Sequence, residues 1–325
     1  MSPSGAAAVR AVVDAGGVEV SRVMEAVETL MSSLAGGHGA LLADHAHFTI
    51  SAGGKRLRPL LVCLSAGVPV PESAELVRAA SAVELVHAAT LVHDDVLDSS
   101  ALRRGRPTVF ARGGRLEATA TGDLLFSRAF ATLAADGEAE PVRLLSRASS
   151  ELAEGELMQR EDAFRADVGI ERYLARCRLK TAVLFRVACE LGALCGGGAI
   201  DTLAAFGERI GLAFQLLDDV LDITGPPERT GKPRGADLLD GTVTLPMILA
   251  RGRSSELEAL DPRCIETAEQ AAAVCEQIAA TGALADVRDR ALAMVTAAKQ
   301  TLPDLPRRQR QALVLVADGV VERYV

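Results

Sequence analysis

The sequence predicts an all-α protein, and three observations support this fold class. Ala, Leu, Val, Arg and Glu dominate the 325 residues, and most of these are good helix formers. Apolar residues recur at spacings of three and four, whereas β-branched runs bounded by turns are scarce. The chain is 49% hydrophobic and can therefore bury a large core. We expect residues 18–325 to form a single domain behind a flexible N-terminus of residues 1–17.

Glycine and proline mark where the predicted helices end. The segment from 72 to about 98 contains neither residue and predicts one long helix. Residues 99–107 are polar and basic and predict a loop, and a second loop rich in Gly and Pro covers residues 224–242. No stretch resembles a linker between independent domains. The predicted helices cover residues 18–42 in two parts, 55–66, 72–98, 115–136, 140–161, 170–195 and 200–223, with four shorter helices after residue 242.

Charge and composition exclude several classes of partner. The net charge of -8 argues against nucleic acid as the main partner, because neutralisation of phosphates drives that binding. The N-terminus lacks the features of a secretion signal, and no apolar run is long enough to span a bilayer. The six cysteines show no CxxC spacing and lie mostly on apolar helical stretches, which is typical of reduced, buried thiols. We therefore expect a cytoplasmic protein without a membrane anchor.

The string Asp-Asp-Val-Leu-Asp occurs twice, each time at the C-terminal end of a predicted apolar helix. Positions i and i+4 lie on one face of a helix, so each string presents two carboxylates in line and a third to one side. Such charges repel, and the C-terminal end of a helix disfavours anions. A solvated helix end is the alternative for a single string, but two strings favour Mg²⁺, which prefers carboxylate oxygens and bridges to phosphates. The candidate metal ligands are Asp94, Asp95, Asp98, Asp218, Asp219 and Asp222.

Basic residues lie close to the first acidic string in the sequence. The segment 53–59, Gly-Gly-Lys-Arg-Leu-Arg-Pro, places three cations at a predicted helix start, which favours an anion. Arg103 and Arg104 follow the first acidic helix, and guanidinium groups suit phosphate oxygens. His87 lies two helical turns before Asp94 and shares its stripe, whereas His93 lies off the stripe and is interpreted as structural. Each feature alone is also compatible with an ordinary surface or core residue, but together they predict a diphosphate site.

These residues together resemble the trans-isoprenyl (polyprenyl) diphosphate synthase family. The resemblance extends from about residue 53 to residue 246, with weaker similarity up to the C-terminus. In this order and spacing the motifs are highly specific, although one alone would be weak. They are GGKRLRP, VHAATLVHDDVLD, LRRGRP, TGDLLFSRAF, GELMQ, RLKTA, FQLLDDVLD and GKPRGADLLDGTVTLP.

The resemblance implies a fold, a set of ligands and a set of site residues. The fold would be a bundle of antiparallel helices around a central cavity, usually assembled as a homodimer. The two aspartate motifs would face each other and bind three Mg²⁺ ions, which hold the diphosphate of an allylic prenyl substrate. Isopentenyl diphosphate would occupy a metal-free basic site formed by Lys55, Arg58, His87 and Arg104. The allylic diphosphate would contact Arg103, Lys180 and Lys232, and Thr181 and Gln215 would line the space where the allylic cation forms.

The implied reaction agrees with the chemistry of these residues. Breaking the allylic C–O bond separates a cation from a diphosphate, and metal ions and basic side chains stabilise the leaving group. The double bond of isopentenyl diphosphate then attacks, and we hypothesise that the departed diphosphate takes the proton. One departure from the family pattern is Thr242, where many members carry a lysine, and this puts one contact to the allylic diphosphate in doubt. The hydrophobic product implies transient membrane contact at release.

Residues just upstream of the first aspartate motif set product length in this family. Bulky aromatics four or five residues before the first aspartate stop the chain short, but here Ala89 and Thr90 occupy these positions. We therefore expect a product longer than C20, with Phe126 and Phe130 as a deeper stop and geranylgeranyl diphosphate as the alternative product. A class I terpene cyclase and a non-catalytic partner subunit are the other two alternatives. The first would lack the isopentenyl site, and the second tends to lose the aspartates.

Overall fold

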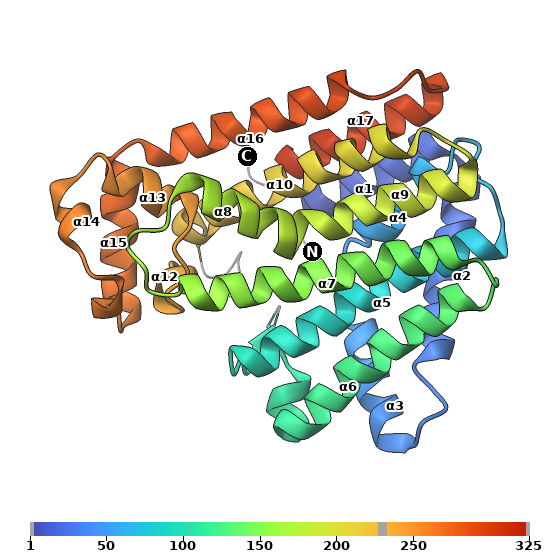
Figure 1. Cartoon of the computed structure of the whole chain (residues 1–325), viewed down its shortest axis with the longest axis horizontal. Helices are drawn as coiled ribbons and strands as arrows, with labels where there is room; N and C mark the ends of the chain where they lie inside the picture. The colour runs from blue at the N-terminus through green and yellow to red at the C-terminus, as the bar shows by residue number, and fades with distance from the viewer. Residues whose placement is uncertain (1–2, 104, 227–232, 323–325) are drawn as a thin grey trace. The chain divides into compact units, whose positions relative to one another are not determined.

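The computed structural model describes residues 3–103, 105–226 and 233–322, and it confirms the all-α prediction (Figure 1). A single two-stranded hairpin accompanies the helices within these residues. The elements are α1 Pro3–Gly16, α2 Val18–Leu34, α3 Ala40–Ser51, α4 Leu57–Ser65, α5 Ala74–Leu97, β1 Leu102–Arg103, β2 Arg106–Pro107, α6 Val109–Ala134, α7 Ala139–Asp162, α8 Ile170–Cys177, the π-helical turn η1 Arg178–Ala182, α9 Val183–Gly196, α10 Ile200–Thr224, α12 Ala236–Leu239, α13 Leu245–Arg251, α14 Ser255–Ala259, the 3₁₀ turn η2 Pro262–Cys264, α15 Ala268–Ala280, α16 Ala283–Gln300 and α17 Arg307–Glu322.

The chain divides into two compact units, each assembled from separate segments of the sequence. Unit 1 comprises residues 1–149, 184–207 and 301–319, and unit 2 comprises residues 150–183, 208–300 and 320–325. The first aspartate motif therefore belongs to unit 1 and the second to unit 2. The prediction of a single domain around a central cavity stays a prediction.

Helix α5 is the central element of unit 1. The Ser73 hydroxyl accepts a hydrogen bond from the backbone N–H of Leu76 and caps its first turn. No Gly or Pro interrupts the helix, and it is buried along almost its whole length, so it is apolar on several faces. It ends at Leu97, and its C-cap is Asp98, the last carboxylate of the first aspartate motif. The motif is thus the polar end of a buried helix.

Helices α5 and α6 pack side by side in opposite directions. His93 contacts Gly122 and Asp123 near one end of the pair, and Arg78 donates from Nε to Asp136 Oδ2 at 2.8 Å near the other. This register places Phe126 at the level of Ala89. Phe130 lies four residues further along α6, about one helical turn beyond that level and farther from Asp94.

Unit 2 contains α8, η1, most of α10 and the helices α12–α16. The turn η1 interrupts the helix predicted over residues 170–195, so the backbone is locally widened at Lys180 and Thr181. Helix α7 approaches this turn closely at Gly155, where an added Cβ would lie 2.6 Å from the backbone nitrogen of Lys180. Glycine is required there because the contact is with backbone, which cannot rotate away as a side chain can.

Besides the interruption at η1, several expectations for secondary structure differ from the structure. Helix α12 lies inside the predicted loop 224–242, and the described residues after 242 form five α-helices, α13–α17, where four were expected. Residues 3–16, which were expected to be flexible, form α1, and the predicted loop 99–107 contains the hairpin β1–β2 with Leu102 paired to Pro107. Helix α6 begins at Val109 rather than near residue 115. Thr108 caps its first turn, and the helix continues on both sides of a kink at Gly114. The hairpin strands have two residues each, which is too short for any periodicity to show.

Cysteine burial and helix hydropathy can be compared directly with the sequence predictions. All six cysteines are unpaired thiols, and four are buried, whereas Cys195 is half-buried and Cys264 is exposed. Burial raises the pKa of the Cys63 thiol to about 12 and has the same effect on Cys189. Within the described ranges, no helix combines the length and the apolar character that crossing a bilayer demands.

Candidate active site

One aspartate of the first motif, Asp95, lines a pocket of unit 1. The walls come from α3, α5, the hairpin and the first turn of α6, and they include His87, Asp95 and Arg103. The Arg103 Nε donates to Asp95 Oδ1 at 2.8 Å, so the structure joins a predicted metal ligand to a predicted phosphate-binding residue. Asp95 is 5% exposed, whereas Asp94 is half-buried and Asp98 is exposed. Asp94 and Asp98 are thus the more accessible carboxylates of this motif.

The three cations of the segment 53–59 have different surroundings. Arg56 donates from Nε to Glu28 at 2.5 Å and from Nη1 to the buried Glu84 at 3.0 Å, so two carboxylates already neutralise it. Arg58 stacks over the ring of Phe185, with its Cζ 4.7 Å from the ring centroid. Lys55 is half-buried. Arg56 therefore has a structural role, and the resemblance had assigned only Lys55 and Arg58 of this segment to the isopentenyl site.

The pocket also contains a cation that the sequence analysis missed. Arg106 lines it, and its Cζ lies 5.3 Å from the ring centroid of Phe48. The string Arg-Gly-Arg-Pro could have indicated Arg106. The hairpin pairs Arg106 with Arg103 and so returns the chain toward the end of α5. Of the four residues predicted for the isopentenyl site, only His87 lines this pocket among those described. Arg104 and Lys232 lie outside the described residues.

His93, interpreted as structural, is packed tightly between α5 and α6. Its ring stacks on Phe126 with the centroids 5.7 Å apart, and its Nε2 lies 3.3 Å from the Thr119 carbonyl oxygen and 3.4 Å from Asp123. A Cβ at residue 122 would lie 2.2 Å from the same nitrogen, so Gly122 leaves the space that the imidazole fills. Phe126 thus contacts the residue next to Asp94.

The second aspartate motif is held by a hydrogen-bonded chain in unit 2. Thr181 Oγ1 donates to Gln215 Oε1 at 2.7 Å, and Gln215 Nε2 donates to Asp219 Oδ1 at 2.7 Å. Tyr173 donates from its hydroxyl to Asp219 Oδ2 at 2.6 Å. The structure therefore brings Thr181, Gln215 and Asp219 together and adds Tyr173, which the sequence analysis did not single out.

The charges around Asp219 disfavour its ionised form. Burial raises its pKa most, the Asp237 carboxylate raises it further, hydrogen bonds from Tyr173 and Gln215 oppose the rise, and Asp218 adds to it. The resulting pKa is about 8. Burial and the Asp219 carboxylate likewise raise the pKa of Tyr173, which keeps the phenol protonated and able to donate. Asp237, whose backbone N–H donates to Asp222 Oδ2 at 3.3 Å, is a further residue that the sequence analysis did not single out.

Lys180 is anchored by a carboxylate. Its Nζ donates to Glu156 Oε2 at 2.5 Å, and Glu156 also pairs with Arg160 at 3.2 Å. Glu156 belongs to the string Gly-Glu-Leu-Met-Gln, which the sequence analysis named as a motif. The sequence did not show that Glu156 pairs with Lys180. The anchor holds the ammonium group at the π-helical turn beside Thr181.

The donor set of both motifs fits Mg²⁺. Each motif offers hard carboxylate oxygens, and Asp218, Asp219 and Asp237 concentrate negative charge that a cation would offset. In the part of the chain that the structure describes, no three His, Cys, Asp or Glu side chains form a closed metal cluster. Mg²⁺ does not need one, because it keeps several waters and shares substrate phosphates with one or two carboxylates. The predicted opposition of the two motifs stays a prediction, since they lie in different units.

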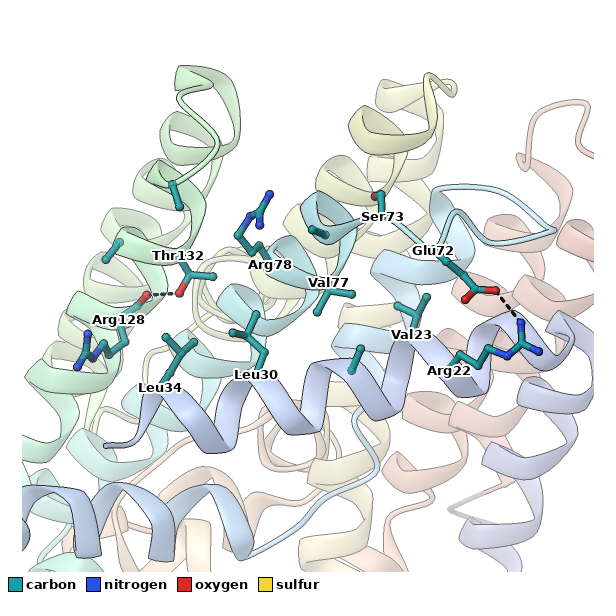
Figure 2. A pocket seen from close by; sticks show the side chains of 14 residues that line it. Arg22, Val23, Leu30, Leu34, Glu72, Ser73, Val77, Arg78, Arg128 and Thr132 are labelled. Carbon is teal, nitrogen blue, oxygen red and sulfur yellow. Dashed lines mark hydrogen bonds and ion pairs between the residues drawn. The ribbon is translucent and has the colours of Figure 1, made fainter. Parts of the chain in front are cut away.

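A separate groove of about 720 Å³ lies at the other end of α5 (Figure 2). Leu30 and Leu34 of α2 and Val77 of α5 form its apolar wall, and Arg22 pairs with Glu72 at its rim at 3.0 Å. Val77 precedes Asp94 by 17 residues, which is roughly 25 Å along a helix. None of the residues predicted from the sequence lines this groove, so it is distinct from the candidate site.

Comparison with known proteins identifies the fold and then the family. The helical architecture with its two aspartate motifs is that of the isoprenoid synthases. A solved polyprenyl synthase from Caulobacter crescentus, in complex with calcium and isoprenyl diphosphate, matches with a TM-score of 0.90 and 34% identity over 96% of this chain and 98% of that one. The polyprenyl synthetase model matches residues 40–281, and the chain belongs to this family. It is accordingly a prenyltransferase that makes polyprenyl diphosphates.

Two curated relatives show how far the similarity extends. A geranylgeranyl diphosphate synthase from Methanosarcina mazei is 36% identical over 286 residues, which cover 85% of this chain and 88% of the relative. Component 2 of a heptaprenyl diphosphate synthase from Geobacillus stearothermophilus is 42% identical over 212 residues, covering 64% of this chain and 66% of the relative. The names of these relatives differ in product length, so similarity alone does not select a product.

Proposed function

We propose that this enzyme condenses isopentenyl diphosphate with an allylic prenyl diphosphate, with the help of Mg²⁺, and releases a trans-polyprenyl diphosphate longer than C20. The observation that carries the proposed length is the absence of bulk one turn upstream of Asp94. Ala89 there is fully buried and Thr90 is half-buried, with its hydroxyl bonded to the carbonyl oxygen of His87 at 2.8 Å. Geranylgeranyl diphosphate is the alternative product, favoured by the similarity to the Methanosarcina enzyme.

The residues of the two motifs have separable tasks in this proposal. Bound Mg²⁺ would neutralise the diphosphate as it leaves the allylic carbon. All six carboxylates of the two motifs are candidates to hold it: Asp94, Asp98, Asp218 and Asp222 are the more accessible ones, and Asp95 and Asp219 are the buried members of each motif. Arg103 and Lys180 would bind the anionic oxygens of the allylic substrate, and Lys180 is oriented for this by Glu156.

The remaining site residues act on the cation and on the second substrate. Thr181 and Gln215 present oxygen atoms that stabilise positive charge, and their mutual hydrogen bond fixes them before substrate binds. The isopentenyl diphosphate would bind to Lys55, Arg58 and His87 and, outside the described residues, to Arg104. Arg106 is a further cation in the pocket that His87 lines. The proton lost after condensation would go to the departed diphosphate.

The proposal is tested by sizing the products of the purified full chain. The protein is incubated with Mg²⁺, labelled isopentenyl diphosphate and allylic primers of C10, C15 or C20, and we expect elongation beyond C20. Products that stop at C20 would support the alternative. Hydrocarbon released without isopentenyl diphosphate would indicate a cyclase instead, and absence of turnover in every reaction would indicate that a second subunit is required.

Product length should respond to bulk at two positions, one beside Ala89 and one about a helical turn deeper. Replacing Thr90 by Phe should shorten the product, because the ring blocks the space next to Asp94. Replacing Phe130 by Ala should lengthen it by one or more isoprene units, because the register of α5 and α6 places this residue about one helical turn deeper, where it would form the deeper stop. The measurement is the distribution of product lengths at a fixed ratio of substrates.

Phe126→Ala serves as the comparison for Phe130→Ala. Phe126 stacks on His93, so its removal should lower the turnover rate more and change the product length less. An unchanged product distribution in Thr90→Phe and in both alanine variants would contradict the assignment of these residues to length control.

A further inference from the structure

Tyr173 is a buried residue of α8 that contacts the second aspartate motif. The side chain is 1% exposed, and its hydroxyl donates to Asp219 Oδ2 at 2.6 Å. Gln215 donates to the other oxygen, Oδ1, at 2.7 Å. Both oxygens of a carboxylate that is itself 1% exposed therefore accept a hydrogen bond from a fixed protein donor. This arrangement sets the plane of the carboxylate and leaves only its remaining lone pairs for another ligand.

Tyr173 is in turn held by a buried ion pair. The guanidinium carbon of Arg176 lies 5.5 Å from the centre of the Tyr173 ring, at the distance of a cation–π contact. Arg176, which is 3% exposed, donates to the Val243 carbonyl oxygen at 2.6 Å and to Asp162 Oδ2 at 3.2 Å. Asp162 is fully buried at the end of α7. The phenol therefore has support on its ring as well as at its hydroxyl.

A merely structural tyrosine would not need this acceptor. A buried phenol requires one hydrogen-bond partner, and a backbone carbonyl satisfies that requirement. Here the partner is a carboxylate of the aspartate motif, next in sequence to Asp218. Groups that bond to metal-binding side chains orient them, and their loss typically lowers metal affinity or activity 10- to 100-fold.

We propose that Tyr173 is a positioning residue of the second aspartate motif, which orients Asp219 through its hydroxyl and so sets the affinity of the motif for Mg²⁺. The support from Asp162 and Arg176 keeps the hydroxyl in place, and Gln215 completes the arrangement from the other side. This inference rests on the Mg²⁺ role proposed above for the second motif.

The first test replaces Tyr173 by Phe, which removes only the hydroxyl. The chain has two tyrosines and no tryptophan, so Tyr324→Phe, at a position outside the described residues, is a matched control. The Tyr173→Phe enzyme should need about 10-fold more Mg²⁺ for half-maximal activity. Its kcat at saturating Mg²⁺ should recover to within about 2-fold, and the KM for isopentenyl diphosphate should not change. A lower melting temperature with an unchanged Mg²⁺ requirement would show a structural role only and would overturn the inference.

The second test does not require the Phe variant to fold. In the Tyr324→Phe enzyme, tyrosine emission comes from Tyr173 alone, and a hydrogen bond to a carboxylate quenches such emission. A cation bound by Asp219 makes this carboxylate a weaker acceptor for the Tyr173 hydroxyl, so Mg²⁺ together with inorganic diphosphate should increase the emission over the concentration range in which calorimetry detects binding. Unchanged emission at saturation would overturn the role of Tyr173 but not that of the motif. If calorimetry detects no binding of Mg²⁺ with diphosphate to the wild-type protein, the proposed metal role fails, and this inference fails with it.

Discussion

Replacing Asp218 by Ala should lower kcat by at least 10²-fold, with loss of the Mg²⁺ response, while the protein stays folded. The functional loss follows because the variant removes an accessible carboxylate of the second motif, and charge stabilisation of this kind is worth about 10²–10³ in rate. Stability should not fall with activity, because Asp218 raises the pKa of the buried Asp219 and its removal relieves like-charge repulsion. The measurements are kcat over a Mg²⁺ titration and the melting temperature without metal.

Asp201→Ala is the matched control for this experiment. Asp201 is an exposed aspartate at the start of the same helix, α10, and lies 17 residues from Asp218. The control should keep its activity and its response to Mg²⁺. Near wild-type turnover in Asp218→Ala would contradict the metal role of the second motif and would favour a non-catalytic subunit.

Replacing Gly155 by Ala should disrupt the π-helical turn that carries Lys180 and Thr181. The new Cβ would lie 2.6 Å from the Lys180 nitrogen and 2.9 Å from the backbone carbon of Leu179, so one of the two backbones must move. Overpacking of this kind typically costs about 1–3 kcal/mol of stability. Because the displaced turn carries the proposed allylic-site residues, we also expect kcat/KM for the allylic substrate to fall by at least 10-fold.

Gly169→Ala provides the control for this steric argument. Gly169 precedes α8 in the same unit, its φ is -86°, and an added Cβ meets no atom of the described residues within 4 Å. Because Gly169 is the N-cap of α8, where Ala is less favourable than Gly, this variant should lose some stability, but less than Gly155→Ala, and should keep the kinetics of the wild type. Gly155→Ala with wild-type stability and allylic kinetics would show that the turn can shift without consequence.

Most helices could be predicted from the sequence because their signals are local. The run from 72 to 98 lacks Gly and Pro and corresponds to α5, Ala74–Leu97, and residues 140–161 correspond to α7, Ala139–Asp162. The hairpin β1–β2 and the π-helical turn were missed for a physical reason. Two-residue strands and a single widened turn involve too few residues to change the hydrophobic period.

The candidate site could be predicted in part, for a related reason. The acidic residues are close in sequence, so spacing alone brings Asp94, Asp95 and Asp98 to one helix end. The pairing of Lys180 with Glu156 joins residues 24 positions apart, and it depends on how α7 packs against the turn η1. Such a pairing leaves no periodic signal in the sequence.

By itself, the sequence determined that the chain is helical, that it carries two aspartate motifs and that it resembles polyprenyl diphosphate synthases. These properties depend on composition and on residues within one or two helical turns of each other. Only the tertiary structure decided that Arg56 is neutralised by Glu28 and Glu84, and that Tyr173 holds Asp219 across 46 positions of sequence. Burial decides these roles, because a charged or polar group removed from water must find partners in the folded chain wherever packing places them.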